Sequence, residues 1–98
     1  MELTTRKLPG VVTSVSNSLY ENIQRASVAF SNGYTLSIIR GQYSHGGSEG
    51  LYEIAIINPN NEMDGSLFDE EDQGDDVLGW CTEDKVMHYI NKIAKEIV

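Results

Sequence analysis

Apolar and polar residues alternate through the middle of the chain, a pattern typical of β-strands with one buried face. In "SVAFSNGYTLSIIR", residues 27–40, Asn32-Gly33 separates two runs rich in aromatic and β-branched residues. An Asn-Gly pair favours a tight hairpin turn because it can take the positive φ angles that such a turn requires. The sequence therefore predicts a β-hairpin, and one face of its second strand carries Tyr34, Leu36 and Ile38.

The same alternation returns after a polar stretch. Residues 41–50 contain four glycines and are predicted to form a loop. The run "LYEIAII", residues 51–57, predicts a third strand, and "NPNN" turns the chain after it. The run "DVLGWC", residues 76–81, predicts a short fourth strand, although Gly79 weakens it.

The C-terminal residues change to helical spacing. Thr82 is a good N-cap, and Glu83 and Asp84 follow in the first turn, where the helix dipole favours negative charge. Apolar residues then recur on one face, with two more that widen it. These are Val86, Ile90, Ile93 and Ile97, together with Met87 and Ala94.

The first third of the chain carries weaker signals. Residues 1–10 are predicted as a loose arm that leads into a short strand at "VVTSV", residues 11–15. Ser18 and Glu21 have the spacing of a capping box, so a helix of at most two turns is expected within residues 16–26.

These elements predict one small α+β domain over residues 1–98. Its core would be an antiparallel β-meander of three to four strands, with the C-terminal helix packed on one face and residues 60–76 as an acidic loop. Ile39 and Ile57 point away from that helix-facing side. We therefore expect the N-terminal segment, or a second subunit in a homodimer, to close the other face.

Charge changes the picture because it is local. The net charge of −8 equals the eight acidic residues of segment 62–76, while the remaining seven acidic and seven basic residues cancel. Scattered Lys and Arg argue against direct nucleic-acid binding. The absence of a long apolar run argues against a membrane span, and a single cysteine without a secretion signal favours the cytoplasm.

Three interpretations of the acidic segment follow. A calcium loop starting at Asp69 would place Gly74 correctly, but Trp80 stands where a bidentate Glu is needed, so no metal site is expected. A solvated loop is the favoured interpretation. The third is a partner-binding patch that imitates nucleic acid, with the candidate residues Asp69, Glu70, Glu71, Asp72, Asp75 and Asp76.

The glycine-rich loop is a second candidate site. Its glycines could let backbone N–H groups approach an anion, although the run matches no nucleotide-binding pattern. A plain connection between strands is the favoured interpretation, and His45 is a general-base candidate by location only. The candidate ligand residues are Tyr43, Ser44, His45, Gly46, Gly47 and Glu49.

No constellation predicts catalysis or a cofactor. Cys81 precedes the C-terminal helix, but Glu83 and Asp84 oppose thiolate formation, so a small, partly buried apolar residue is the favoured interpretation. His88 is expected to be exposed. Trp80 either fills the core under the helix or, like Tyr43, anchors an interface.

The segments "NGYTLSIIRGQYSHGGSEGLYEIAII" and "GDDVLGWCTEDKVMHYINKI" together resemble a group of small proteins encoded by tailed bacteriophages. The resemblance covers about residues 30–98 and brings no catalytic residues with it. It implies an accessory protein that acts on host machinery or host defences. Because no catalytic constellation is present, we expect a non-enzymatic protein in the host cytoplasm that binds a host or phage protein, with the acidic segment as a candidate inhibitory surface. The alternative expectation is a small-ligand or nucleotide-binding module that uses the glycine-rich loop.

Overall fold

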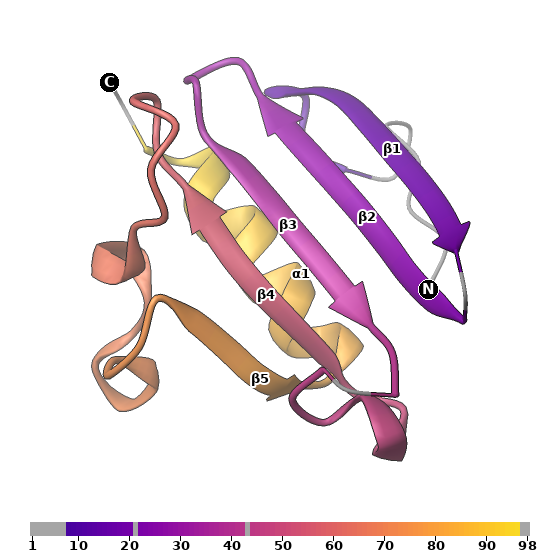
Figure 1. The fold of residues 1–98 in the computed structure, drawn as a ribbon. Helices are drawn as coiled ribbons and strands as arrows, with labels where there is room; N and C mark the ends of the chain where they lie inside the picture. Colours follow the sequence, from indigo (N-terminus) through magenta and orange to yellow (C-terminus); the bar gives the residue numbers. More distant parts are fainter. Residues whose placement is uncertain (1–7, 21, 43, 97–98) are drawn as a thin grey trace.

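The computed structural model describes residues 8–20, 22–42 and 44–96. Within these residues, five antiparallel strands form one sheet in the order β1-β2-β3-β4-β5, and one helix follows them (Figure 1). The strands are β1 (Val12–Tyr20), β2 (Ile23–Phe30), β3 (Thr35–Arg40), β4 (Tyr52–Ile57) and β5 (Val77–Cys81), and the helix is α1 (Glu83–Ala94). Short 3-10 turns interrupt two connections: η2 (Gly47–Glu49), η3 (Gly65–Leu67) and η4 (Glu70–Asp72).

The predicted α+β meander with a C-terminal helix is confirmed, with one strand more than the three to four expected. The short strand expected at residues 11–15 is present as the start of β1. The helix expected within residues 16–26 was wrong, because β1 and β2 occupy this stretch as a hairpin. Ser18 does not cap a helix; it pairs with Arg25 across the β1–β2 hairpin. Leu19, Ile23 and Ala26 do recur at helical spacing after Ser18, but an isolated helix of at most two turns is marginal. The two strands instead gain a ladder of backbone hydrogen bonds within the sheet. Glu21, the other half of the expected capping box, lies outside the described residues.

The predicted hairpin around Asn32-Gly33 is confirmed, with Val28 opposite Leu36. Gly33 supplies the positive φ of the turn, at 94°. Asn32 has a different role, because its side-chain amide donates to the carbonyls of Ile93 and Glu96 at 2.8 and 3.1 Å. Ile93 lies in the last turn of α1, and Glu96 lies two residues beyond the end of the helix, where carbonyls no longer accept regular helical bonds. The turn therefore fixes the C-terminal end of the helix to the sheet.

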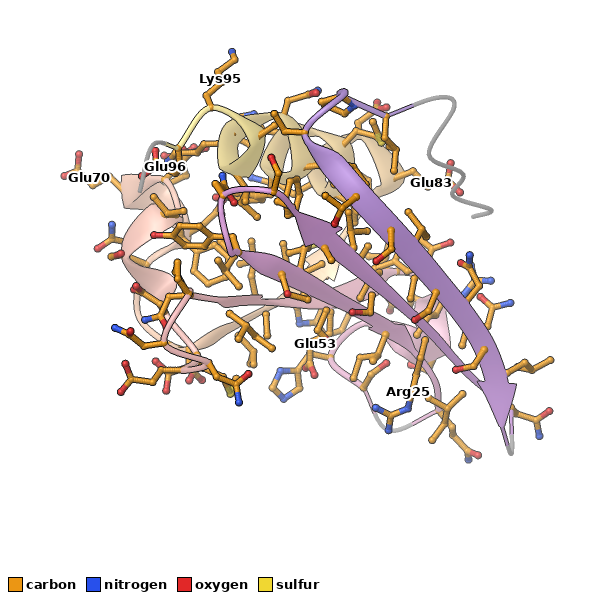
Figure 2. The ribbon with its side chains drawn as sticks, turned by 90° about the horizontal axis from the view of Figure 1, so that it is seen from above. Arg25, Glu53, Glu70, Glu83, Lys95 and Glu96 are labelled. Atoms are coloured by element: carbon orange, nitrogen blue, oxygen red, sulfur yellow. The ribbon has the colours of Figure 1, made fainter. Side chains whose placement is uncertain are left out.

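The core lies between α1 and one face of the sheet, as Figure 2 shows from above. The predicted apolar stripe is confirmed for Val86, Ile90 and Ile93, which are fully buried, and Ile97 lies outside the described residues. Tyr89 is also fully buried on this face. Thr82 caps the helix as predicted, since its hydroxyl accepts from the Lys85 amide at 3.2 Å.

The opposite face of the sheet carries a central row of small side chains beside the half-buried Ile39 and Ile57, which point to this side as expected. Ser27, Ser37 and Ala55 lie in one row across β2, β3 and β4, and none of them is buried. Leu8 and Val11 pack against the core instead, so the described part of the N-terminal segment closes the helix side. No described helix is long and apolar enough to cross a membrane.

Candidate acidic binding surface

The acidic segment is attached to the helix by an apolar contact. Phe68, between turns η3 and η4, is only 1% exposed, and its ring meets the Tyr89 ring edge-on at a centroid distance of 5.3 Å. Aromatic pairs in this arrangement add to the free energy gained from burial. The segment is therefore packed against the protein at its middle.

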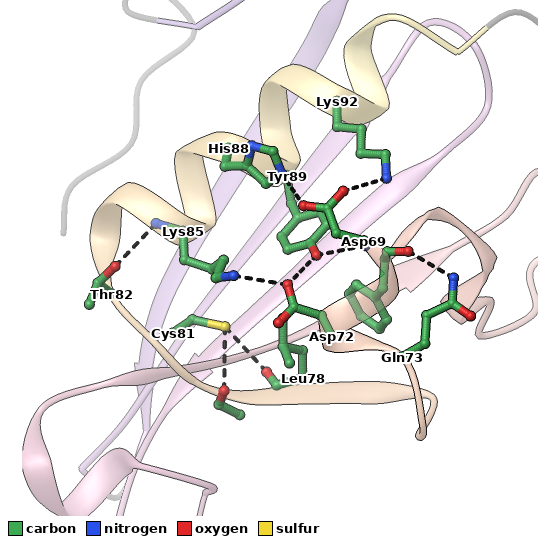
Figure 3. A network of polar contacts seen from close by, with 12 residues as sticks. Asp69, Asp72, Gln73, Leu78, Cys81, Thr82, Lys85, His88, Tyr89 and Lys92 are labelled. Carbon is green, nitrogen blue, oxygen red and sulfur yellow. Dashed lines mark hydrogen bonds and ion pairs between the residues drawn. The ribbon is translucent and has the colours of Figure 1, made fainter.

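Asp69 is held by two side chains of α1. Its Oδ1 accepts from the Lys92 ammonium at 2.7 Å, and its Oδ2 lies 2.6 Å from His88 Nε2 (Figure 3). The Lys92 bond, and then the His88 bond, lower the pKa of Asp69 below its ordinary value. The carboxylate is thus the stable form of Asp69 at this position.

Asp72 is held one helical turn away. Its Oδ2 accepts from the Tyr89 hydroxyl at 2.5 Å and from the Lys85 ammonium at 2.9 Å (Figure 3). The Tyr89 bond is the larger cause that lowers the pKa of Asp72, followed by Lys85. The Tyr89 oxygen also accepts from the backbone N–H of Asp69 at 2.9 Å. Tyr89 thus connects both ends of η4 to the core.

The six acidic residues that the sequence placed in one patch are therefore divided by the structure. Asp69 and Asp72 face the helix, and the description of the whole segment as a solvated loop is wrong for these two. The other four are exposed: Glu70, Glu71, Asp75 and Asp76. Glu70 points away from the body of the protein in Figure 2. We call these four the acidic surface.

The geometry of the acidic surface follows from its anchors. Glu70 and Glu71 stand between Asp69 and Asp72 on the single turn η4, so both of their neighbours are fixed to α1. Asp75 and Asp76 follow Gly74, and the Asp76 amide donates to the Asp75 carboxylate at 2.7 Å. Exposed carboxylates on an anchored turn present a preorganised negative charge.

Three carboxylates, of Asp69, Glu71 and Asp72, come within 4.8 Å of one another. Such a group could attract a divalent cation. Two of its members, however, already accept hydrogen bonds from Lys85, Lys92 and Tyr89, and a cation would have to compete with these donors. The close approach of these three carboxylates is therefore accounted for by an ion-pair network within the protein.

The glycine-rich loop packs tightly against β5. A Cβ atom on Gly79 would lie 2.3 Å from the Cβ of His45, and one on Gly46 would lie 2.9 Å from the Cα of Trp80. The carbonyl of His45 accepts from the Trp80 amide at 3.1 Å. These glycines are needed because two segments of backbone approach closely.

Several amides of the same loop are already used. The amides of Gly47, Glu49 and Gly50 donate to carbonyls within the loop, and the His45 amide donates to the Glu53 carboxylate. The His45 ring also lies 2.8 Å from that carboxylate. Ser44 closes the loop through its hydroxyl, which bonds the backbone of Gly41. These contacts leave few backbone amides of the loop free to bind an anion. Tyr43, the remaining candidate ligand residue, lies outside the described residues.

The remaining candidates occupy structural positions. Cys81 is buried more fully than expected, and burial raises the pKa of its thiol to about 11, which keeps it unreactive at neutral pH. Trp80 is 60% exposed, so the reading that placed it in the core under the helix was wrong. His88 is exposed as expected, although its ring contacts Asp69.

The functional residues that sequence reasoning missed are Lys85, Tyr89 and Lys92. Their spacing of four and three residues places them along one side of a helix, and His88 lies beside them. That spacing is the signal that could have paired them with the acidic segment.

No known protein family matches the chain, and no curated protein or solved structure matches it either.

Proposed function

We propose that this chain is a non-enzymatic bacteriophage accessory protein that uses its acidic surface to bind a basic host or phage protein in the host cytoplasm. One observation carries the proposal: Asp69 and Asp72 are anchored to α1, and Glu70 and Glu71, between them, are exposed. The phage setting rests on the sequence resemblance over residues 30–98.

Anchoring matters for binding because a flexible acidic loop would lose conformational entropy when a partner orders it. Here the turn is already fixed by Phe68 and by the two aspartates, so less entropy remains to be lost. Four exposed carboxylates also attract a basic surface over a distance of about one Debye length, roughly 8 Å at physiological ionic strength.

The kind of partner follows from this charge. A groove lined by Lys and Arg, such as one that holds nucleic-acid phosphates, would accept carboxylates in their place. The protein would then act as an inhibitor that competes with nucleic acid for the groove. Catalysis is not needed for this role, and His45, Cys81 and His88 each have a structural contact that accounts for them.

The test is affinity capture from bacterial lysate at low and high salt, read by mass spectrometry. The bait proteins are wild type, the double variant Glu70→Gln/Glu71→Gln and the control Glu49→Gln/Asp84→Asn. The control removes the same number of charges from two exposed acidic residues outside the acidic surface.

We expect a basic protein that wild type and the control retain, that the Glu70/Glu71 variant loses and that high salt releases. Added DNA should compete for the same partner. A partner that all three baits retain equally at high salt would contradict the proposal.

A further inference from the structure

The two edges of the sheet differ in how they are protected. Strand β5 has five residues, and Trp80 within it has a positive φ of 59°, which interrupts its regular backbone. The other edge is β1, which has nine residues and pairs only with β2 among the described strands. Its outer side therefore presents a row of backbone donors and acceptors to whatever lies next to it.

Among the described residues, β1 shows few of the features that usually prevent edge-to-edge pairing. Soluble proteins protect such edges with charged residues, prolines, bulges or short length. The sequence "VTSVSNSLY" has no charge and no proline, and its one register irregularity lies at the start, between Val12 and Ser14. Leu19, near the other end, is 68% exposed.

Charge also favours this edge for self-association. Two copies that each carry a net charge of −8 repel one another wherever their acidic segments approach. The acidic turns lie at the β4–β5 side of the sheet, opposite β1 (Figure 1). Four strand spacings separate the two edges, roughly 19 Å, which exceeds the Debye length of about 8 Å. The β1 edge is therefore the side where two copies meet with least repulsion.

We propose that β1 pairs with β1 of a second copy of this chain, antiparallel about a two-fold axis, to form a continuous ten-stranded sheet. In such an isologous interface the paired residue numbers have a constant sum. An axis at Asn17 places Leu19 opposite Val15 of the second copy and Ser16 opposite Ser18. Val15 and Leu19 lie on the helix side of the sheet. In this register the exposed Leu19 of each copy packs against Val15 of the other copy.

This interface differs from the second subunit expected at the open sheet face. The first experiment separates the two by measuring molar mass with light scattering over a range of protein concentrations. The edge variant is Ser16→Glu/Ser18→Glu, which places like charges opposite one another in the dimer. The control is Ser27→Glu, one strand inward and directly across from Ser16 on the same face.

We expect twice the chain mass of 10.9 kDa for wild type and for Ser27→Glu, and the single-chain mass for the edge variant. Far-ultraviolet circular dichroism and thermal melting check that each variant is folded. A monomeric wild type overturns the proposal, as does an edge variant that remains dimeric. Dissociation of Ser27→Glu would also overturn it, because the open face would then be the interface.

A second experiment tests the register without relying on charged variants. Under mild oxidation, Asn17→Cys should form an intermolecular disulfide at high yield, because the axis brings the two cysteines directly opposite each other. Thr13→Cys, four residues along the same strand, should cross-link poorly. The native Cys81 is buried and does not compete. Equal cross-linking at both positions, or none at Asn17→Cys, overturns the two-fold pairing. This inference does not depend on the proposed function of the acidic surface.

Discussion

The Tyr89 hydroxyl lies 2.5 Å from the Asp72 carboxylate and connects the acidic segment to the buried face of the helix. The ring of Tyr89 is fully buried, and the same oxygen accepts from the Asp69 amide. Burial and the bond to Asp72 raise the pKa of Tyr89 above its ordinary value, so the hydroxyl stays protonated and able to donate. One side chain thus joins the core to the start and the end of turn η4.

Tyr89→Phe should destabilise the protein by about 1–3 kcal/mol. The substitution leaves the ring in the core and removes the donor to Asp72 and the acceptor for the Asp69 amide, and hydrogen bonds to charged groups are worth about that much. The control is Tyr52→Phe, because the buried Tyr52 hydroxyl has no hydrogen-bond partner among the described residues.

Urea unfolding curves of both variants provide the measurement. Tyr52→Phe should leave the free energy of unfolding unchanged or raise it by up to about 1 kcal/mol, since it removes a buried polar group without a bond. Equal destabilisation by the two substitutions would show that ring packing, and not the hydroxyl of Tyr89, holds the segment.

The six candidate carboxylates should separate into two classes when they are neutralised singly. Asp72→Asn weakens the bonds to Tyr89 and Lys85 and should cost about 1–2 kcal/mol, which lowers the melting temperature by roughly 4–8 °C per kcal/mol in a domain of this size. Glu70→Gln and Glu71→Gln should change the melting temperature very little, because both side chains are exposed.

Differential scanning calorimetry at neutral pH measures this difference directly. A large loss of stability in Glu70→Gln or Glu71→Gln would mean that these residues also hold the fold, and they could then no longer be read as a free binding surface.

The stability of the protein should fall in acid through Asp69 and Asp72. Both carboxyls have a pKa below the ordinary 3.8 in the folded protein, Asp69 through Lys92 and His88, and Asp72 through Tyr89 and Lys85. The unfolded chain therefore binds these protons more readily. The stabilisation is present above a pH of about 4 and is lost as the pH falls through the lower folded values.

The measurement is the urea midpoint of wild type and of Asp69→Asn/Asp72→Asn between about pH 5 and about pH 2. The double variant should start lower and change less with pH, since the two groups no longer titrate. Parallel curves for the two proteins would assign the acid sensitivity to other carboxyls.

Local signals in the sequence were sufficient for much of the fold. The helix begins at its predicted N-cap, Thr82. In β3 and β4 every second residue is apolar, and these residues lie on the buried face of the sheet. The β1–β2 hairpin was missed because the spacing of Ser18 and Glu21 is a local helix signal. Pairing with a neighbouring strand outweighed it, and no single segment reveals such pairing.

The candidate site was harder to predict because its partners are distant in sequence. Asp69 and Lys92 are 23 residues apart, and Asp72 and Tyr89 are 17 apart. Charge counting could show that segment 62–76 carries the whole net charge, but the count does not show which carboxylates face the helix. The division between anchors and exposed residues depends on Phe68, whose burial sets the orientation of η4.

Gly79→Ala should destabilise the protein, because its new Cβ would lie 2.3 Å from the Cβ of His45, where the glycine-rich loop packs on β5. Relief requires the loop to shift, and overpacking of this kind costs about 1–3 kcal/mol. Gly10→Ala is the matched control, since a Cβ there meets no atom within 4 Å, and it should be neutral or slightly stabilising. Urea unfolding measures both changes. Wild-type stability in Gly79→Ala would show that the loop moves freely, and the glycine-rich loop would then regain the capacity to rearrange around a small ligand.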